Sequence, residues 1–415
     1  MATFAPRSLL ACLRPASILF VAAVVRVLWV VACPNEPSSD QTTYHAGAVS
    51  IASGLGYRDK AGEVSDYYPV GYPAALAPFY YVLGHAPSSA FAANLLLGLL
   101  SVFALYLLGR ELFGEEVGRA AALALAVYPT FVMYTTCVAS ENAYIPAILL
   151  GLWLSLRLGR AQRWFGLAVL TGIAFGVACL ARSNGVLLIP VVGLALWLRS
   201  QPIAGAAARL AVVGAVIGAV LLPWALRNQA QFGRLTPFSM NGGVNFWMGN
   251  HEGGNGRYSP PPDPLMALPQ AARDGTLMEL GLAFVRENPL RYAQLCVLRT
   301  IHTLSSDTSA VRWNEIGLLK RVPERVLWPM KIGTSLVHVS LFGLLLVLLA
   351  VTLRRRAWRR EDLLVAAALA ASAVPFVFIV ASDRYHLPLT PFVMSWCAAL
   401  GLRGRPTVDA ARNLP

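Results

Sequence analysis

Long apolar segments alternate with short polar segments that contain arginine along most of this chain. An apolar stretch of about 18 residues or more is long enough to cross the hydrocarbon core of a bilayer as a helix. Residues 71–84 are also apolar, but this stretch is short, aromatic and interrupted by proline, which predicts an interfacial or re-entrant helix. Other stretches approach or exceed the spanning length, and we predict ten spans at residues 15–32, 88–108, 119–134, 142–156, 164–180, 185–198, 206–224, 332–353, 363–381 and 387–402.

The composition supports this interpretation. Of the 415 residues, 56% are hydrophobic and only 13% are charged, and the mean hydropathy is +0.57. A soluble protein of this length cannot bury so much apolar surface, whereas lipid can solvate it. We therefore predict an all-α polytopic membrane protein, with an N-terminal transmembrane module at 1–224 and a C-terminal one at 331–415. Two large loops at 33–87 and 225–330 are polar, and the second has a helical pattern near 277–303.

The formal net charge of +13 arises largely from arginines in the short loops. Positive charge there is typical of the cytoplasmic side of a membrane protein. Ten spans place both termini and these arginines on one side, so both large loops are expected outside. A nucleic-acid partner is not indicated, because the sequence has no zinc finger, Walker A loop or basic-aromatic platform. The short-loop residues behind this prediction are Arg7, Arg14, Arg110, Arg119, Arg157, Arg160, Arg163, Arg199, Arg209, the arginines of 354–360, Arg403 and Arg405.

No metal or disulfide framework is predicted. The six cysteines show no CxxC spacing, and most lie in or beside apolar segments. His45 and His386 have no ligand-type partners at a fixed spacing. We predict no cofactor and no metal ligands, although a divalent metal is compatible with the chemistry considered below.

Polar residues gather at the span ends that the topology places outside. Each has an ordinary explanation: Glu141 suits a helix N-terminus, and Arg182 and Arg227 can extend to lipid headgroups. Arg26, inside the first span, can do the same or face a cavity. Taken together, carboxylates and guanidinium groups on one face predict a site for an anionic ligand reached from the membrane. The set is Asp40, Asp66, Glu141, Arg182, Asn184, Arg227, Asn228, Asp383, Arg384 and His386.

The segment from Ser38 to Tyr72 is the most distinctive part of this set. Asp40 stands where a helix can begin, with Tyr44 and Ala48 at helical spacing behind it. The sequence leaves two interpretations of Asp40 open. It either caps this helix, as Asp commonly does, or it belongs to the site.

The ordered motifs of the chain resemble a known family. The chain is similar to the polyprenyl-phosphate-sugar-dependent glycosyltransferases with the GT-C fold, of the protein O-mannosyltransferase and aminoarabinose transferase type. Many relatives have an acidic residue directly after the first-loop Asp, where this chain has Gln41. The resemblance covers most of the chain in the same order and is carried by Asp40 with Tyr44 and Ala48, Gly54–Tyr57, Tyr68–Pro73, Gly109–Gly114, Ser140–Glu141, Leu180–Arg182, Leu222–Asn228, Asn241–Asn245 and Arg384–Pro388.

This resemblance implies an inverting transfer of a sugar from a polyprenyl-phosphate donor to a lipid, glycan or protein acceptor. It implies a bacterial plasma-membrane location with the active site on the extracytoplasmic face. Asp40 is the expected general base and Glu141 the second candidate, as base or as an acceptor-orienting residue. Arg182, Arg227 and Arg384 are expected phosphate partners, because the guanidinium fork matches phosphate oxygens. The remaining substrate-binding candidates are Tyr57, Asp66, Tyr68, Asn228 and Tyr385.

Two other classes remain open from the sequence. A transporter or flippase of lipid-linked sugars would also bind an anionic lipid, but the two halves of the chain show no convincing similarity. A non-catalytic assembly subunit is the other alternative. The large Gly/Asn/Pro-rich loop at 227–330 favours an external acceptor site and hence the enzyme.

Overall fold

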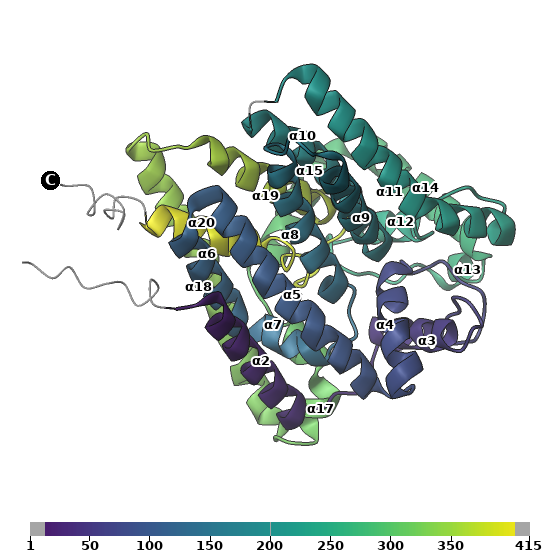
Figure 1. The fold of residues 1–415 in the computed structure, drawn as a ribbon. Coiled ribbons are helices and arrows are strands. Elements are labelled where there is room, and N and C mark those ends of the chain that lie inside the picture. The colour runs from purple at the N-terminus through teal and green to yellow at the C-terminus, as the bar shows by residue number, and fades with distance from the viewer. Residues whose placement is uncertain (1–12, 200, 403–415) are drawn as a thin grey trace, which may run out of the picture.

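The computed structural model describes residues 13–199 and 201–402, and this part of the chain is helical, with two isolated β-bridges and no extended strand. The predicted all-α class is confirmed. Each of the ten predicted spans contains helix. Arg7, Arg403 and Arg405 lie outside the described residues. The corresponding elements (Figure 1) are α2 (Pro15–Ala32), α5 (Pro87–Phe113), α6 (Glu115–Val127) with α7 (Pro129–Met133) and η1 (Tyr134–Thr136), α8 (Glu141–Leu158), α9 (Phe165–Ala181), η2 (Ser183–Leu188) with α10 (Ile189–Leu198), α11 (Ile203–Phe232), α18 (Leu327–Arg354), α19 (Arg360–Phe378) and α20 (Thr390–Leu402).

Within the described residues, five helical segments are long and apolar enough to cross a bilayer: α2, α5, α11, α19 and the continuous segment Glu324–Arg354. The pair α6 and α7–η1, bent by 57°, is a sixth if it forms one broken span. Helices α9, α10 and α20 are apolar but shorter. Side chains such as Phe20 (70% exposed) and Ile203 (90% exposed) project from the bundle, as expected where lipid covers the surface. The chain is a multi-pass membrane protein, while the count of ten crossings and their sidedness remain predictions.

Glycines allow the central helices to approach closely. A Cβ on Gly172 of α9 would lie 2.6 Å from the Cβ of Val216 in α11, and one on Gly176 would lie 2.8 Å from the Cβ of Val220. Small residues at four-residue spacing permit this kind of helix packing in membranes. The central helices therefore form a tight bundle, which fixes the ends where the polar residues lie.

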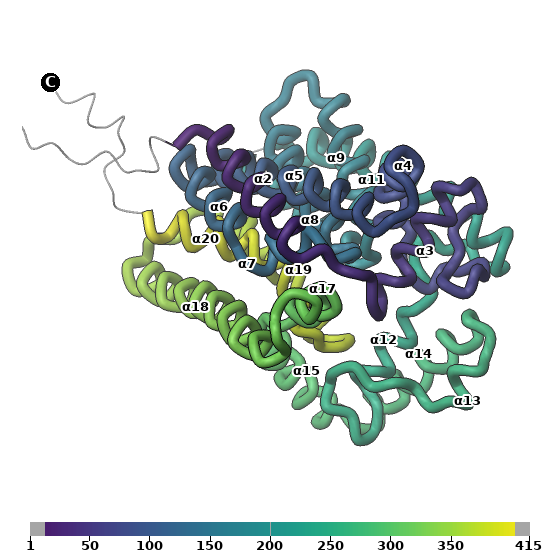
Figure 2. Tube along the Cα trace, turned by 90° about the horizontal axis from the view of Figure 1, so that it is seen from below, coloured from purple at the N-terminus to yellow at the C-terminus, as the bar shows by residue number. Residues whose placement is uncertain are grey.

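The two large polar segments fold as short helices. The first contains α3 (Asp40–Ala52) and α4 (Gly71–Leu83), so the helix predicted at 71–84 is confirmed. Figure 2 shows α3 and the helices α12–α14 at the same end of the bundle. The predicted helical middle is also confirmed, as α14 and α15. The second segment contains α12 (Gly242–Gly249), α13 (Asp263–Met266), α14 (Gln270–Glu287), α15 (Pro289–Leu304), α16 (Ser309–Trp313), α17 (Glu315–Leu319) and η3 (Glu324–Val326).

Both predicted boundaries of the second loop fall inside helices. Helix α11 continues through Pro223 to Phe232 and ends at Gly233, whose φ of 69° is left-handed and suits glycine at a helix end. Helix α18 already begins at Leu327. The change from apolar to polar sequence marks the edge of the apolar surface, which is a different position from the end of the helix.

The second polar segment is anchored to the end of α19. The buried Arg299 of α15 donates hydrogen bonds to the carbonyl oxygens of Val377 and Gly249, both at 2.8 Å. It also donates to the Asn250 side chain at 2.8 Å. A Cβ on Gly249 would lie 1.9 Å from the Ile379 oxygen, so only glycine fits there. These contacts fix the start of residues 380–389, the segment that joins α19 to α20.

Candidate functional site

Asp40 is the first residue of α3, and Ser39 before it has a φ of 51°, an uncommon value for a residue other than glycine. The N-cap position belongs to Ser39, whose side chain makes no capping hydrogen bond. Instead the Tyr68 hydroxyl donates to Oδ1 at 2.8 Å, and Arg384 Nη2 donates to Oδ2 at 2.7 Å. The capping interpretation of Asp40 is therefore wrong, because Ser39 holds the N-cap position and both carboxylate oxygens of Asp40 accept from side chains outside α3.

Arg384 reaches Asp40 from the segment 380–389, 344 positions away in the chain. Its guanidinium carbon lies 4.4 Å from the ring centroid of Trp313 and 5.6 Å from that of Tyr385. The side chains of Arg384 and Asp40 are 18% and 22% exposed. This ion pair is held firmly on one side by aromatic rings, yet a ligand can still reach it.

A second ion pair lies beside the first. Glu141 begins α8, Arg182 directly follows α9, and Arg182 Nη1 lies 2.6 Å from Glu141 Oε1. The Arg182 guanidinium carbon lies 5.5 Å from the Tyr385 ring centroid and 6.0 Å from that of Tyr144. Tyr385 is thus shared by both arginines. The other Glu141 oxygen is buried and has no hydrogen-bond partner.

The charge state of Asp40 follows from these contacts. Burial raises the pKa of this carboxyl, but the Arg384 charge and the Tyr68 hydrogen bond outweigh it, and the pKa lies below its usual range. Asp40 is therefore ionised at neutral pH, as a general base must be.

Asp66 lies in a different environment. It is fully buried, and its Oδ1 accepts a hydrogen bond from the Gln270 side chain while Oδ2 has no partner. Burial raises the pKa of Asp66 to about 6, against the opposing effect of the Arg227 charge. Its carbonyl oxygen accepts from the Met240 N–H at 3.1 Å. Asp66 therefore links the first polar segment to the second, and its pKa is raised by burial.

Tyr57, Arg227 and Asn228 form a separate cluster at the end of α11. Arg227 donates to the Tyr57 carbonyl oxygen at 3.2 Å and to Asn228 Oδ1 at 2.9 Å. Its guanidinium carbon lies 4.5 Å from the Trp224 ring centroid. Asn228 in turn donates to the Thr236 carbonyl oxygen. Tyr57, Arg227 and Asn228 thus brace the end of α11, and their substrate-binding role remains a prediction. The residues that the structure brings together at the two ion pairs are Asp40, Tyr68, Glu141, Arg182, Arg384 and Tyr385.

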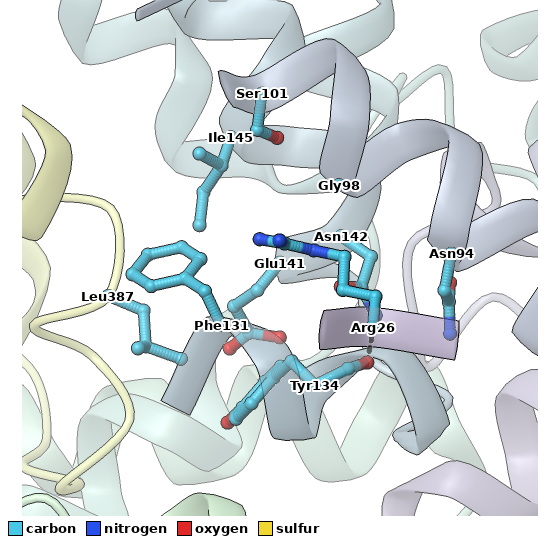
Figure 3. Close-up of a pocket in the computed structure, with 10 residues that line it drawn as sticks. All are labelled: Arg26, Asn94, Gly98, Ser101, Phe131, Tyr134, Glu141, Asn142, Ile145 and Leu387. Carbon is cyan, nitrogen blue, oxygen red and sulfur yellow. Dashed lines mark hydrogen bonds between the residues drawn. The ribbon is translucent and has the colours of Figure 1, made fainter. Parts of the chain in front are cut away.

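Arg26 lines a small cavity of about 10 Å³ behind Glu141 (Figure 3). It is buried, and its Nη1 donates to the carbonyl oxygens of Ala126 at 2.9 Å and Ala22 at 3.2 Å. Ala126 is in the last turn of α6, where the helix breaks and its final carbonyl groups lack helical partners. Arg26 therefore faces the cavity and satisfies the end of α6, and it does not extend to headgroups.

The sequence did not predict a larger pocket of about 370 Å³ that is lined by Asp383, the residue before Arg384. Asp383 on its wall is held by Arg312 at 2.7 Å and by the Thr308 hydroxyl at 2.5 Å. Basic residues of the second polar segment were visible in the sequence, but nothing indicated that they fold onto residues 381–383. The lining residues are Arg257, Tyr258, His302, Ser306, Thr308, Arg312, Ala381, Ser382 and Asp383.

The contacts of Asp40 do not form a metal site. Its two oxygens meet a guanidinium and a hydroxyl, and the neighbouring Gln41 is occupied elsewhere. Gln41 donates to the Trp313 carbonyl oxygen at 3.0 Å and accepts from the Val138 N–H at 2.9 Å. One metal-type group exists among the described residues, and it contains His386 with Asp307 and His338. The sequence showed no ligand-type partner of His386 at a fixed spacing, because these neighbours come from distant parts of the chain.

Comparison with known proteins places this geometry in context. Residues 68–225, less than half of the chain, match the family model described as dolichyl-phosphate-mannose-protein mannosyltransferase. No match was found among curated protein sequences.

Solved structures of membrane glycosyltransferases are similar in fold. ArnT from Cupriavidus metallidurans, bound to undecaprenyl phosphate, aligns with a TM-score of 0.58 and 16% identity, covering 94% of this chain and 61% of that one. The apo oligosaccharyltransferase of Archaeoglobus fulgidus aligns with a TM-score of 0.56 and 15% identity, covering 94% of this chain and 50% of that one. The chain thus spans about half to three-fifths of the length of these structures. Its fold is the GT-C fold of membrane glycosyltransferases.

Proposed function

We propose that this protein is an integral membrane glycosyltransferase that moves a sugar from a polyprenyl-phosphate donor to an acceptor on the extracytoplasmic face. The observation that carries the proposal is the accessible Asp40–Arg384 pair, which joins the first polar segment to the segment 380–389 in a GT-C fold. The undecaprenyl phosphate bound to ArnT and the dolichol-phosphate bound to the archaeal oligosaccharyltransferase indicate the donor class.

In the proposed reaction, an acceptor hydroxyl attacks the anomeric carbon from the face opposite the phosphate. The new carbon–oxygen bond forms as the bond to the phosphate oxygen breaks, so the configuration inverts. Asp40 takes the hydroxyl proton, and the polyprenyl phosphate leaves with the bonding electrons. The negative charge that develops on the leaving phosphate is stabilised by Arg384 and Arg182.

Arg384 can serve Asp40 and the phosphate together. A guanidinium has five N–H donors, and only Nη2 contacts Asp40. The remaining donors are available to phosphate oxygens, while Trp313 and Tyr385 hold the guanidinium plane in place. Glu141 holds Arg182 through the ion pair between them. We therefore assign Glu141 the role of orienting this cation, and Asp40 the role of accepting the proton.

The location on the outer face of a bacterial plasma membrane rests on the arginine distribution and on the family resemblance. With Arg110, Arg160 and Arg355 inside, Asp40 and the whole second polar segment lie outside. The donor already resides in the bilayer, which fits a chain in which no soluble nucleotide-binding motif was found. The acceptor is a hydroxyl-bearing lipid, glycan or protein.

The proposal is tested with purified protein and polyprenyl phosphates carrying radiolabelled hexoses or pentoses, together with extracted envelope lipids and glycans. The expected result is labelled acceptor and free polyprenyl phosphate in equal amounts from the parent protein. Arg355→Ala, on the opposite side, should behave like the parent. Labelled lipid that crosses vesicle bilayers without cleavage would favour a flippase and overturn the enzyme.

A further inference from the structure

Three buried side chains from distant parts of the chain meet at one point inside the protein. Asp307 lies between α15 and α16, His338 is in α18, and His386 lies between α19 and α20. Their ligand-type atoms are all within 4.8 Å of one another, and each side chain is fully buried. Nothing in the proposed transfer uses them.

The surrounding hydrogen bonds leave several ligand-type atoms of this group without a partner. His338 Nε2 is 3.0 Å from the Leu304 carbonyl oxygen, which requires the proton on Nε2 and leaves the lone pair on Nδ1. The Thr130 hydroxyl donates to Asp307 Oδ2 at 2.5 Å. His338 Nδ1, Asp307 Oδ1 and both ring nitrogens of His386 have no hydrogen-bond partner.

Such an arrangement is costly without an occupant, because buried polar atoms in folded proteins are nearly always satisfied. The separation of His386 and Asp307 fits a shared metal ion better than a direct hydrogen bond. His386 Nε2 and Asp307 Oδ2 are 3.6 Å apart, too far for a hydrogen bond. Two ligands of a tetrahedral zinc ion, each about 2.0–2.1 Å from the metal, lie about 3.4 Å apart.

We propose that Asp307, His338 and His386 bind one zinc ion. Two imidazoles and a carboxylate are ligands that zinc accepts, with a fourth position for water. Thr130 on the carboxylate and the Leu304 carbonyl on His338 supply the outer contacts that orient metal ligands.

The zinc ion has a positioning role. It joins α18 and the start of α16 to the segment 380–389, and His386 is two residues from Arg384. The neighbouring Thr308 hydroxyl already binds Asp383 across the same junction. The metal thus holds the segment that carries Arg384 against the rest of the site, without contact to the donor or acceptor.

The test measures metal directly and does not depend on glycosyl transfer. The full-length protein is purified with a tag that contains no histidine, incubated with zinc, desalted and assayed for bound metal by mass spectrometry. The expected result is one zinc per chain, falling at least tenfold in His338→Ala and in His386→Ala. His302→Ala, a histidine outside the group, should keep its zinc.

A second readout covers the case in which a variant fails to fold. Cobalt added to the parent protein should give the visible absorption of a tetrahedral site, and zinc should abolish it in a 1:1 titration. A chelator should lower the Tm of the parent but leave that of Asp307→Asn unchanged. Absence of a cobalt spectrum in the parent, or equal zinc in the histidine variants and the parent, would overturn the site.

Discussion

Replacement of Asp40 by Asn separates the catalytic and structural roles of this residue. Asn keeps the size of the side chain, and its oxygen can still accept a hydrogen bond from the Tyr68 hydroxyl. Its amide nitrogen, however, meets the N–H donors of Arg384, which lie 2.7 Å from the present carboxylate oxygen. The variant therefore loses both the negative charge and the proton acceptor where the first polar segment meets the segment 380–389.

The magnitudes of the two effects differ. A general base contributes about 10²–10⁴-fold, so transfer should fall at least about a hundredfold. The structural cost is smaller, about 1–3 kcal/mol of unfolding free energy, because the donors of Arg384 lose their acceptor but the guanidinium keeps its contacts with Trp313 and Tyr385. A helix cap would show the opposite pattern, since Asn caps about as well as Asp.

The assay is single-turnover transfer from a radiolabelled polyprenyl-phosphate sugar, with thermal unfolding measured on the same samples. Glu36→Gln is the matched control, because Glu36 pairs with Lys320 in an exposed ion pair that the proposed mechanism does not use. The control should remain within about twofold of the parent, as surface pairs contribute little. Parent-like turnover by Asp40→Asn would remove Asp40 as the base and make Glu141 the residue to test.

Three further predictions follow from the site and its supports. Arg384→Ala should weaken donor binding more than Arg384→Lys, since Lys keeps the charge but loses the fork, while Arg355→Ala should bind donor normally; equal losses at both positions would contradict a localised phosphate site. Asp66, with its pKa raised to about 6, favours the folded state most below its ordinary pKa of about 3.9 and loses this contribution as the pH rises to 6, so the Tm of Asp66→Asn should rise relative to that of the parent from about pH 4 to about pH 6; Tm curves that stay parallel over this range would contradict the raised pKa. Arg26→Met should lower the Tm, because the end of α6 loses its donor at Ala126, and an unchanged Tm would show that this contact is dispensable.

The hydrophobic pattern was sufficient to predict the helical membrane fold, because lipid exposure dictates long apolar runs. It also placed Asp40 correctly at the start of a helix. The predicted span ends at residue 224, whereas helix α11 continues through Pro223 to Phe232 and is capped by Gly233. Hydropathy reports which surface meets lipid, and it does not report where backbone hydrogen bonding stops.

Long-range partners were beyond the reach of the sequence. The predicted topology and the family resemblance both indicated Asp40 and Arg384 as site residues, but their direct contact depends on the chain path between α19 and α20. The same holds for His386, whose neighbours Asp307 and His338 have no recognisable spacing. Local patterns predict elements and their ends, whereas side-chain pairing across hundreds of positions is set by packing.

The charge balance of the site bears on how the proposed reaction proceeds. Two carboxylates and two guanidinium groups, Asp40 with Arg384 and Glu141 with Arg182, leave the group nearly neutral before a donor binds. A polyprenyl-phosphate sugar is a phosphodiester with one negative charge, and the departing phosphate carries more, about −1.5 to −2 at neutral pH. Asp40 loses its own charge as it takes the proton, which frees Arg384 to meet that increase. Proton transfer and leaving-group stabilisation are then coupled through one guanidinium, so the arginine acts most strongly in the transition state, when catalysis requires it.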